Sequence, residues 1–358
     1  MRLLFILPGG GGTGGAHSVV QEAGGLVRLG AEVALALSQD RAEDFAWHYP
    51  ELKGSGVRLH AVAGTEALAA LLPGFDIACA TSAPSAHMLA DALTLTKGKT
   101  ARPAYYVQDY EPLIFSPGTQ KWRDARATYA MFEAPLLFAK TDWLRRVVND
   151  NHGRAVEKVR ASIDHATYQP AGRTADAPLT VSAMVRPKTP RRGPRRTLRV
   201  LRALSDAYDG RLRLISFGCP AEDIGAIGAR LPRRVEHRGV LRRGQVAEVL
   251  QQSDLFLDLS DYQAFGRTGL EAMACGCVPL LPVFGGADEF ARHWDNALVV
   301  DTRSDAAILE AAGAFLGADP AVRERMRGRA IATAANYTVE KAAMSEYQAF
   351  SNFLARAS

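Results

Sequence analysis

The sequence has little of what disulfide-stapled or membrane-spanning proteins need. Its 358 residues include only four cysteines, and these are scattered, which argues against a disulfide framework. No run approaches the roughly 18 apolar residues that a membrane-spanning helix requires. Residues 1–8 are apolar only briefly and run into glycines, so we interpret them as a first β-strand rather than a signal peptide. From both absences we expect a cytoplasmic protein.

The cysteines also lack the spacing of a metal or redox site. Cys275 and Cys277 are one residue apart, which fits neither a zinc knuckle nor a redox pair. We expect them to be small buried residues where a helix meets a strand, because a free cysteine behaves as a small hydrophobe.

What is present is the composition of a soluble α/β protein of two domains. The sequence is 47% hydrophobic and 23% charged, as soluble globular proteins are. Its length exceeds what one ordinary core holds. Strand and helix signals alternate along residues 3–152 and again along residues 179–335, which indicates two mainly parallel, doubly wound sheets. We predict two Rossmann-like domains facing a cleft: residues 1–170 and 171–338, with a final helix over 339–358 crossing back to the first domain.

The net charge of +5 is unevenly distributed. Between positions 186 and 199 the chain has seven cations and no acid. One interpretation is a solvated basic loop. The other is a phosphate site at its start, followed by a patch for anionic lipid on the inner face of the membrane. The tract has no interleaved aromatics and no recognisable module, so we do not expect nucleic acid as a partner.

A glycine-rich loop, residues 8–17, joins the first strand to the first helix. Glycines let the backbone approach a ligand, and a helix N-terminus adds partial positive charge. The loop satisfies GxGxxG, but no clear acid follows the second strand, so we favour a cleft wall touching a phosphate or an acceptor over NAD binding or a plain turn. Gly14, Gly15 and His17 are its candidates. We place Gly15 among the donor-binding residues, and His17 either contacts a ligand or caps the helix.

The most informative segment is 260–276, SDYQAFGRTGLEAMACG. A buried strand precedes it, and a turn leads into a short helix that carries Glu271. A fixed carboxylate can accept both hydroxyls of a ribose, and the first helical turn can take phosphate oxygens. The alternative is a solvent-facing helix acid. The candidate donor-binding residues of this segment are Phe265, Gly266, Arg267, Thr268 and Glu271.

Other strand ends of the second half supply matching groups. Arg186 and Arg191 follow the strand 180–185, and two guanidinium forks suit a diphosphate. Gly218 ends the next strand, where a glycine lets a base or ribose come close. Because the carboxyl ends of parallel strands share one edge, we expect these residues to converge on one ligand.

These residues resemble a known family. Gln263 and Glu271, followed by AMACGCVP, look like the signature of family 4 retaining glycosyltransferases of the GT-B fold, and residues 285–289 resemble the loop after it. Arg186 and Arg191 stand where that family carries the Arg and Lys that hold the donor diphosphate. Residues 184–193 further resemble the subgroup of bacterial surface-layer rhamnosyltransferases, which use a deoxythymidine-diphosphate sugar.

The resemblance implies transfer of a sugar, with rhamnose or another deoxysugar as one option, from a dTDP-, UDP- or GDP-sugar to a hydroxyl of a glycan, lipid-linked or small-molecule acceptor. The departing phosphate helps to deprotonate the acceptor in such enzymes. Residues 258–261 are not a DxD pair, and arginines can replace a cation, so we expect neither metal nor cofactor. On the acceptor side we expect Gly14, His17, Gln108 and Glu111, with Asp109 as a candidate catalytic group; a plain surface turn is the alternative for residues 108–111.

The chain departs from the family at position 263, where the family has a first Glu near the transferred sugar. Gln263 is a second candidate catalytic residue: it can hydrogen-bond sugar hydroxyls but brings no charge, and Asp261 is the acid we expect to compensate in part. Two alternatives to an active transferase follow. One is a nucleotide-sugar-binding protein of this fold with impaired catalysis, and the other is a nucleotide-sugar epimerase, which would consume donor without an acceptor.

Overall fold

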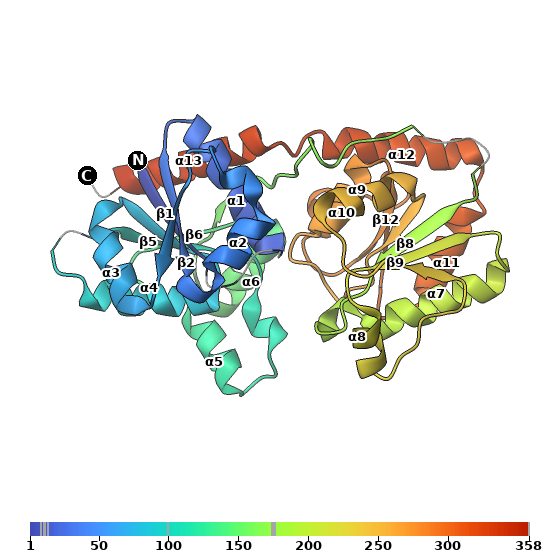
Figure 1. Ribbon diagram of the computed structural model, residues 1–358, viewed down its shortest axis with the longest axis horizontal. Coiled ribbons are helices and arrows are strands. Elements are labelled where there is room, and N and C mark those ends of the chain that lie inside the picture. Colours follow the sequence, from blue (N-terminus) through green and yellow to red (C-terminus); the bar gives the residue numbers. More distant parts are fainter. Residues whose placement is uncertain (8, 10–11, 13, 99, 173–176, 357–358) are drawn as a thin grey trace. The chain divides into compact units, whose positions relative to one another are not determined.

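The computed structural model describes residues 1–7, 9, 12, 14–98, 100–172 and 177–356. The chain divides into two compact units (Figure 1). Unit 1 is Met1–Ser162 with Tyr337–Ser358, and unit 2 is Ile163–Asn336. Each unit is built around its own parallel sheet.

Unit 1 holds a sheet of seven strands in its described part, in the order β3-β2-β1-β4-β5-β6-β7, and every pairing is parallel. The strand order reverses between β1 and β4, which is the switch point of a doubly wound sheet. The central strands are apolar over Leu3–Leu7 of β1 and over all of β4, because helices cover both faces. The strands are β1 (Arg2–Leu7), β2 (Glu32–Ser38), β3 (Arg58–Val62), β4 (Ile77–Ala80), β5 (Arg102–Tyr106), β6 (Leu136–Ala139) and β7 (Glu157–Lys158).

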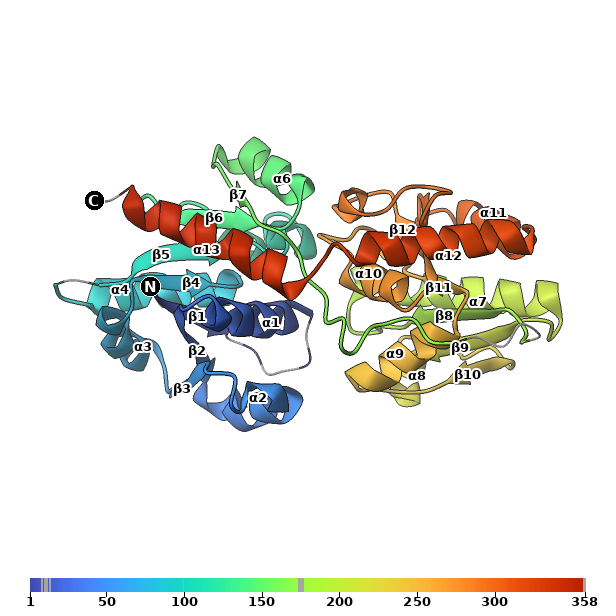
Figure 2. The same ribbon diagram turned by 90° about the horizontal axis from the view of Figure 1, so that it is seen from above.

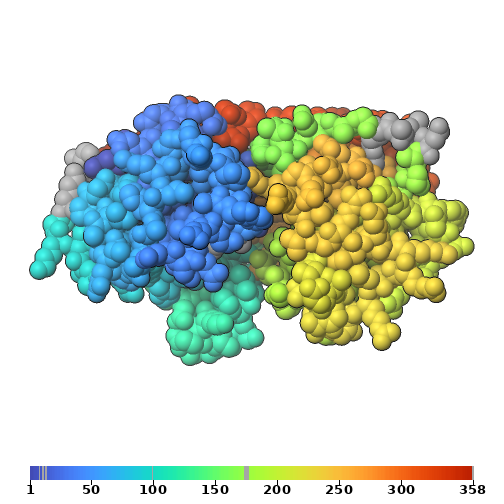
Figure 3. Space-filling view, in the orientation of Figure 1, coloured from blue at the N-terminus to red at the C-terminus, as the bar shows by residue number. Residues whose placement is uncertain are grey.

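The helices that connect the parallel strands of unit 1 lie on both faces of its sheet (Figure 2). The pair α1 and α13 packs together, and α3 and α4 form another pair. Residues 111–127 with α5 project from the rest of unit 1 (Figure 3). The helices are α1 (Gly14–Arg28), α2 (Ala42–His48), α3 (Thr65–Leu71), α4 (Ala83–Leu95), α5 (Gln120–Ala127), α6 (Asp142–His152) and α13 (Val339–Ala355).

The C-terminal helix α13 is part of the core of unit 1. Its Phe350 is fully buried and meets Phe5 of β1 and Phe138 of β6 edge-on, with ring centroids 6.1 and 5.3 Å apart. The guanidinium of Arg102 stacks on Phe353, 3.7 Å from the ring centroid. Figure 2 shows α13 running along α1. Helix α13 therefore packs on one face of the unit 1 sheet and helps to bury it.

Unit 2 holds a parallel sheet of six strands in its described part, in the order β10-β9-β8-β11-β12-β13. The strands are β8 (Thr180–Met184), β9 (Arg213–Phe217), β10 (Val235–His237), β11 (Leu255–Leu257), β12 (Val278–Pro282) and β13 (Leu298–Val300). The helices are α7 (Pro194–Tyr208), α8 (Ala221–Ala226), α9 (Arg243–Gln252), α10 (Arg267–Ala274), α11 (Asp305–Leu316) and α12 (Pro320–Ala334). The order reverses between β8 and β11, so the loops after these two strands flank the switch point.

The predicted fold class, two Rossmann-like α/β halves, is confirmed, but the boundary lies earlier than residue 170. It falls between Ser162 and Ile163 because the segment that follows is held by unit 2. The carbonyl of Gln169 accepts a hydrogen bond from Gln251 (2.9 Å), and that of Ala171 accepts one from Arg327 (3.4 Å). The second unit likewise ends at Asn336, before the expected residue 338.

The first turn of α6 is capped by a threonine. Thr141 is the N-cap, and its hydroxyl accepts from the backbone N–H of Leu144 at 3.1 Å. The sequence gives little signal for α2, which is short, or for α5, which is strongly polar. Within the described ranges, no helix combines the length and apolarity needed to cross a bilayer.

Candidate functional site

The loops after β8 and β11 lie together at the carboxyl edge of the unit 2 sheet. These strands are hydrogen-bonded neighbours, with Ala183 opposite Leu257. Beyond the sheet, the backbone N–H of Asp261 donates to the carbonyl of Arg191 at 2.8 Å. The sheet thus joins the two segments that the sequence singled out as donor-binding.

The first two arginines of the basic tract differ from the rest. Arg186 follows β8, is exposed and donates through Nε to the Met184 sulfur at 3.1 Å. Nearby protein atoms lower its pKa by desolvation, yet no carboxylate of the described residues forms an ion pair with it. Arg191 is half-buried, with its guanidinium 5.1 Å from the centre of the Tyr262 ring. Arg186 is therefore a cation without a carboxylate partner among the described residues.

Most other cations of the tract are already neutralised or hydrogen-bonded. The contacts are Lys188 with Asp223 (3.0 Å), Arg196 with Asp261 (2.8 Å), Arg199 with Asp305 (2.8 Å) and Arg195 with the carbonyl of Ile227 (2.7 Å). Exposed pairs of this kind contribute little to stability, but they cancel local charge. The tract is therefore not a single free cationic patch, which weakens its interpretation as a lipid-binding surface.

Glu271 lies in α10 and is buried, with 6% of its surface exposed, so it is not a solvent-facing helix acid. Its Oε1 accepts from Arg267 Nε at 2.9 Å, one helical turn earlier. Burial raises the pKa of Glu271, and the Arg267 charge lowers it in part. Arg267 already donates to one oxygen of the Glu271 carboxylate. Glu271 can therefore accept ribose hydroxyls only through the lone pairs that Arg267 does not use.

The turn into α10 is held by aromatic packing. Gly266 is the helix N-cap in the left-handed region, with φ of 93°. Phe265 meets Phe290 edge-on, with ring centroids 5.4 Å apart. Thr268 is the second residue of the helix. Phe265 to Thr268 thus form one rigid turn at the start of α10, beside the buried Glu271.

Gln263 is buried, with 6% of its surface exposed. Its Nε2 donates to a carboxylate oxygen of Asp258 and to the Ser260 hydroxyl (3.2 Å). Asp261, the acid that we expected to compensate for the missing Glu, instead pairs with Arg196. The carboxyl group beside the Gln263 side chain is therefore that of Asp258.

Gly218 joins the ends of two further strands. Its N–H donates to the carbonyl of Gly239 at 2.7 Å, which ties the end of β9 to the segment after β10. A Cβ on Gly218 would lie 2.8 Å from Met184 Cγ, so a side chain does not fit beside the end of β8. Both ring nitrogens of His237 are used, by Ser216 and by the carbonyl of Cys219, each at 2.9 Å.

In unit 1 the structure brings Gly15 and Gln108 together. A Cβ on Gly15 would lie 2.9 Å from Gln108 Oε1, and Gln108 Nε2 donates to the carbonyl of Thr81 at 3.2 Å. Both residues lie beyond carboxyl ends of the sheet, as predicted from the alternation of strands and helices. Gly14 is the first residue of α1. Residues 8, 10, 11 and 13 of the glycine-rich loop lie outside the described part.

Glu111 caps a helix rather than lining an open surface. Its Oε1 accepts from the N–H of Ala83 (2.6 Å), at the start of α4, and from the Tyr105 hydroxyl (3.4 Å). Burial raises the pKa of Glu111, and the charge of Asp109 adds to this shift. The two acids therefore lie close enough to interact, and the plain surface turn does not describe residues 108–111.

His17 is buried in α1, which begins before it, so it does not cap the helix. Its ring stacks on Tyr49 with centroids 6.1 Å apart and planes 10° apart. His17 is therefore part of the core of unit 1. Its contact with a ligand stays a prediction.

The four cysteines are buried, and none of them forms a disulfide within the described residues. Burial, followed by the charge of Glu271, raises the pKa of Cys275 to about 12. The described residues include no cluster of His, Cys, Asp or Glu side chains arranged to hold a metal ion.

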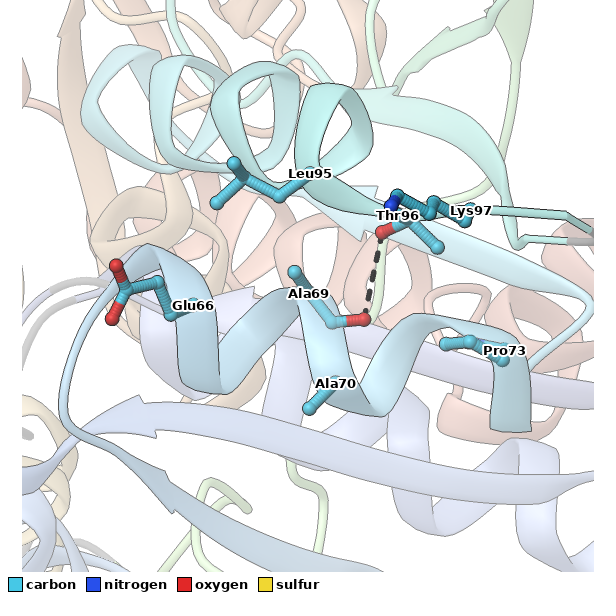
Figure 4. A pocket seen from close by; sticks show the side chains of 7 residues that line it. All are labelled: Glu66, Ala69, Ala70, Pro73, Leu95, Thr96 and Lys97. Atoms are coloured by element: carbon cyan, nitrogen blue, oxygen red, sulfur yellow. Dashed lines mark hydrogen bonds between the residues drawn. The ribbon is translucent and has the colours of Figure 1, made fainter.

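Two surface hollows lie in unit 1. One of about 450 Å³ lies between α3 and α4, where the hydroxyl of Thr96 donates to the carbonyl of Ala69 at 3.5 Å (Figure 4). The other, of about 240 Å³, lies at the carboxyl ends of β1, β2 and β3 and is mainly apolar. The first is lined by Glu66 and Lys97 at opposite ends and contains none of the predicted site residues.

Sequence reasoning missed two contacts. The Arg267–Glu271 ion pair had a signal, because opposite charges four residues apart face each other on a helix. The role of Asp258 had none, since its partner Gln263 lies across a loop with no regular spacing.

The fold is that of the GT-B glycosyltransferases. HepE of Anabaena, crystallised with UDP and glucose, is similar with a TM-score of 0.79 and 17% identity, covering 98% of this chain and 99% of that one. Sucrose-phosphate synthase of Thermosynechococcus elongatus is similar with a TM-score of 0.77 and 16% identity over 100% of both chains. At these identities the likeness establishes the fold.

Sequence comparison adds a family match within unit 2. Residues 219–333 match the family model described as glycosyl transferases group 1. A stretch of 60 residues is 40% identical to N-acetyl-α-D-glucosaminyl L-malate synthase of Bacillus anthracis, covering 17% of this chain and 16% of that relative. The family match and the fold together support a glycosyltransferase. Neither supports the rhamnosyltransferase subgroup in particular.

Proposed function

We propose that the protein is a retaining glycosyltransferase that uses a nucleoside-diphosphate sugar. The observation that carries the proposal is the joining of the β8 and β11 loops through Asp261 and Arg191, beside the ion-pair-free Arg186 and the buried Glu271. A diphosphate and a ribose are the two ligand groups that arginines and a fixed carboxylate bind best. HepE, similar in fold, was crystallised with UDP-glucose.

In this proposal unit 2 binds the donor. Arg186 and Arg191 hold the diphosphate, Glu271 accepts a ribose hydroxyl, and the turn from Phe265 to Thr268 contacts phosphate and sugar. Arginines offset the charge that develops on the leaving diphosphate, so the donor site needs no metal ion in this proposal.

The transfer breaks the bond between the sugar's anomeric carbon and the diphosphate oxygen and forms a bond to the acceptor oxygen on the same face. The acceptor proton passes to the departing phosphate. The protein then contributes orientation and leaving-group stabilisation rather than a covalent nucleophile. Unit 1 would position the acceptor through Gly14, Gly15, Gln108 and Asp109, and the acceptor is a hydroxyl of a glycan, lipid or small molecule.

Donor hydrolysis and transfer test the proposal. The protein is incubated with UDP-, dTDP- and GDP-sugars, with and without a panel of hydroxyl acceptors, and nucleotide release is measured. Acceptor-dependent release that falls strongly in Arg186→Ala and stays in Arg211→Ala supports it. Arg211 is a suitable control because it lies in the turn before β9. It is therefore at the amino ends of the parallel strands, whereas the candidate site is at their carboxyl ends.

The same assay separates the two alternatives. Donor consumption that needs no acceptor favours an epimerase. Tight nucleotide binding without turnover of any donor favours a binding protein of this fold. The lipid-surface interpretation is tested by sedimentation with anionic vesicles, where the ion pairs of the basic tract lead us to expect weak binding.

A further inference from the structure

Asp258 is a buried carboxyl group, and each of its two oxygens accepts at least one hydrogen bond from a neighbouring donor. It follows β11 and exposes 9% of its surface. Its Oδ1 accepts from the backbone N–H of Ser260 at 3.2 Å and from the Ser260 hydroxyl, and its Oδ2 accepts from Gln263 Nε2. No cation of the described ranges pairs with it. A buried charge without an ion pair depends on such hydrogen bonds.

The same contacts fix the orientation of the Gln263 amide. Its Nε2 donates to Asp258 and to the Ser260 hydroxyl, so both amide hydrogens are used. None of the described residues donates to Oε1, yet Oε1 is not among the fully buried atoms that lack a partner. The amide oxygen is thus the polar atom of this side chain to which no described residue donates.

The backbone of Gln263 is fixed as well. Its N–H donates to the carbonyl of Phe284 (3.3 Å), and its own carbonyl accepts from the N–H of Gly286 (2.7 Å). Residue 263 therefore bridges the loop that leads into α10 and the loop after β12. A shift of its side chain would be felt at the start of α10, where the donor is expected.

We propose that Asp258 is the positioning residue of the donor loop and the reason why position 263 holds an amide. A glutamate there would place a second carboxylate against Asp258, and two such charges in contact cannot both stay ionised. In this proposal Gln263 replaces the family's glutamate because Asp258 lies beside it. The replacement then does not by itself indicate a loss of function. The identity of the ligand rests on the proposed function, whereas the pairing of Asp258 with Gln263 does not.

The pairing limits what Gln263 can bind. With both amide hydrogens donated inward, the side chain offers a ligand one acceptor and no donor. It suits a hydroxyl of the transferred sugar that donates a hydrogen bond, and it repels a carboxylate at that place. We therefore expect neutral or deoxy sugars as donors rather than uronic acids.

An exchange of the two side-chain types tests the pairing. In Gln263→Glu two carboxylates meet, and in Asp258→Asn the new amide at position 258 cannot accept from all three donors. The double variant Asp258→Asn/Gln263→Glu restores an amide facing a carboxylate. The melting temperature of the ligand-free protein should fall by roughly 5 to 15 °C in Gln263→Glu and return most of the way in the double variant.

The pH dependence and a neighbouring acid give controls. The loss in Gln263→Glu should be larger at pH 8 than at pH 5, because the raised pKa of the carboxylate pair lets the folded state bind a proton at the lower pH. Asp261→Asn removes the same charge two residues from Gln263, so Asp261→Asn/Gln263→Glu should not recover stability. If both double variants recovered the same stability, the inference of a specific pairing would be overturned. Removal of any nearby negative charge would then explain the recovery.

Donor turnover gives the readout that a purely structural role would not produce. In Gln263→Glu the affinity for UDP should change less than about threefold, while turnover of the best donor sugar falls by tenfold or more and recovers in the Asp258→Asn/Gln263→Glu variant. A double variant that is no more stable than Gln263→Glu overturns the inference, even where wild-type protein turns over a donor. Recovery of stability in a protein that binds no nucleotide would instead overturn the proposed function and leave the pairing intact.

Discussion

Arg267 and Glu271 form a nearly buried ion pair, with 2.9 Å between Nε and Oε1, at the start of α10. The side chains expose only 13% and 8% of their surface. Arg267 holds the carboxylate in place, and the oxygen lone pairs that it leaves remain for a ligand. This pair links the helix that the sequence marked to the ribose-binding role that we propose.

Substitution of Glu271 should weaken donor binding without unfolding the protein. Glu271→Gln keeps the size of the side chain but removes its negative charge. In our proposal that charge attracts both Arg267 and a hydroxyl of the ribose. We expect the affinity for the best nucleoside diphosphate to fall by about 1.5 to 3 kcal/mol, measured by calorimetry. Glu310→Gln, an exposed acid of α11, is the control and should bind as wild type does.

The affinity should also depend on pH through Glu271. Burial raises its pKa, so it begins to take up a proton at a higher pH than an exposed Glu does. Nucleotide affinity should be constant above that pKa and fall as the pH is lowered through it. A Glu271→Gln variant that keeps the wild-type pH profile between pH 4 and 8 would show that another group is responsible.

Arg186 should act on the diphosphate. Arg186→Ala should weaken UDP binding by roughly 1.5 to 3 kcal/mol, because it removes a charge-assisted hydrogen bond, and should affect uridine binding little. The comparison of UDP with uridine by calorimetry isolates the phosphate contribution. Equal losses for both ligands would contradict the assignment.

Gly193 should be required for the stability of unit 2. Its φ is 60°, and a Cβ would lie 2.3 Å from the carbonyl oxygen of Leu259. Gly193→Ala should lower the free energy of unfolding by roughly 2 to 4 kcal/mol, from backbone strain and overpacking together. Gly210→Ala is the matched control: its φ is 82°, but no atom lies within 4 Å of the added Cβ, so about 1 kcal/mol is expected. Urea unfolding of both variants measures the difference.

Glu346 should destabilise unit 1 at high pH. Burial, followed by the negative charge of Glu22, raises the pKa of Glu346 well above its usual range. The folded state therefore binds more protons than the unfolded state, and stability falls as the pH rises above the unfolded pKa of a Glu. Glu346→Gln should remove this loss and be more stable than wild type at pH 8, by roughly 1 to 3 kcal/mol.

At pH 4, where the unfolded state is also largely protonated, Glu346→Gln and wild type should unfold at similar urea concentrations. The nearby Lys140–Glu22 ion pair is kept in the variant. A wild type that is as stable as the variant at pH 8 would show that Glu346 is not held protonated.

The architecture could be predicted from the sequence because it depends on local patterns. Short apolar runs such as 77–80 and 136–139 form the buried strands β4 and β6. The boundary at Ser162 could not be predicted, because it depends on distant hydrogen bonds to the carbonyls of Gln169 and Ala171.

The candidate site was predictable where one residue type at a strand end limits the chemistry. Arg191 and the segment around Glu271 were expected at one edge, and the bond from Asp261 to Arg191 shows their loops together. The state of each charge was not predictable. Asp261 forms an ion pair with Arg196, and Gln263 donates a hydrogen bond to Asp258. Loop geometry decides which polar groups meet, and the sequence does not reveal that geometry.

The central claim, that unit 2 binds a nucleoside diphosphate through Arg186 and Glu271, is tested most directly by titration calorimetry with UDP, dTDP and GDP. We predict that at least one binds the wild type with micromolar affinity, and that Arg186→Ala and Glu271→Gln each weaken it by tenfold or more while Arg211→Ala does not. Binding of none of the three to the wild type, or equal binding to all four proteins, would contradict the account.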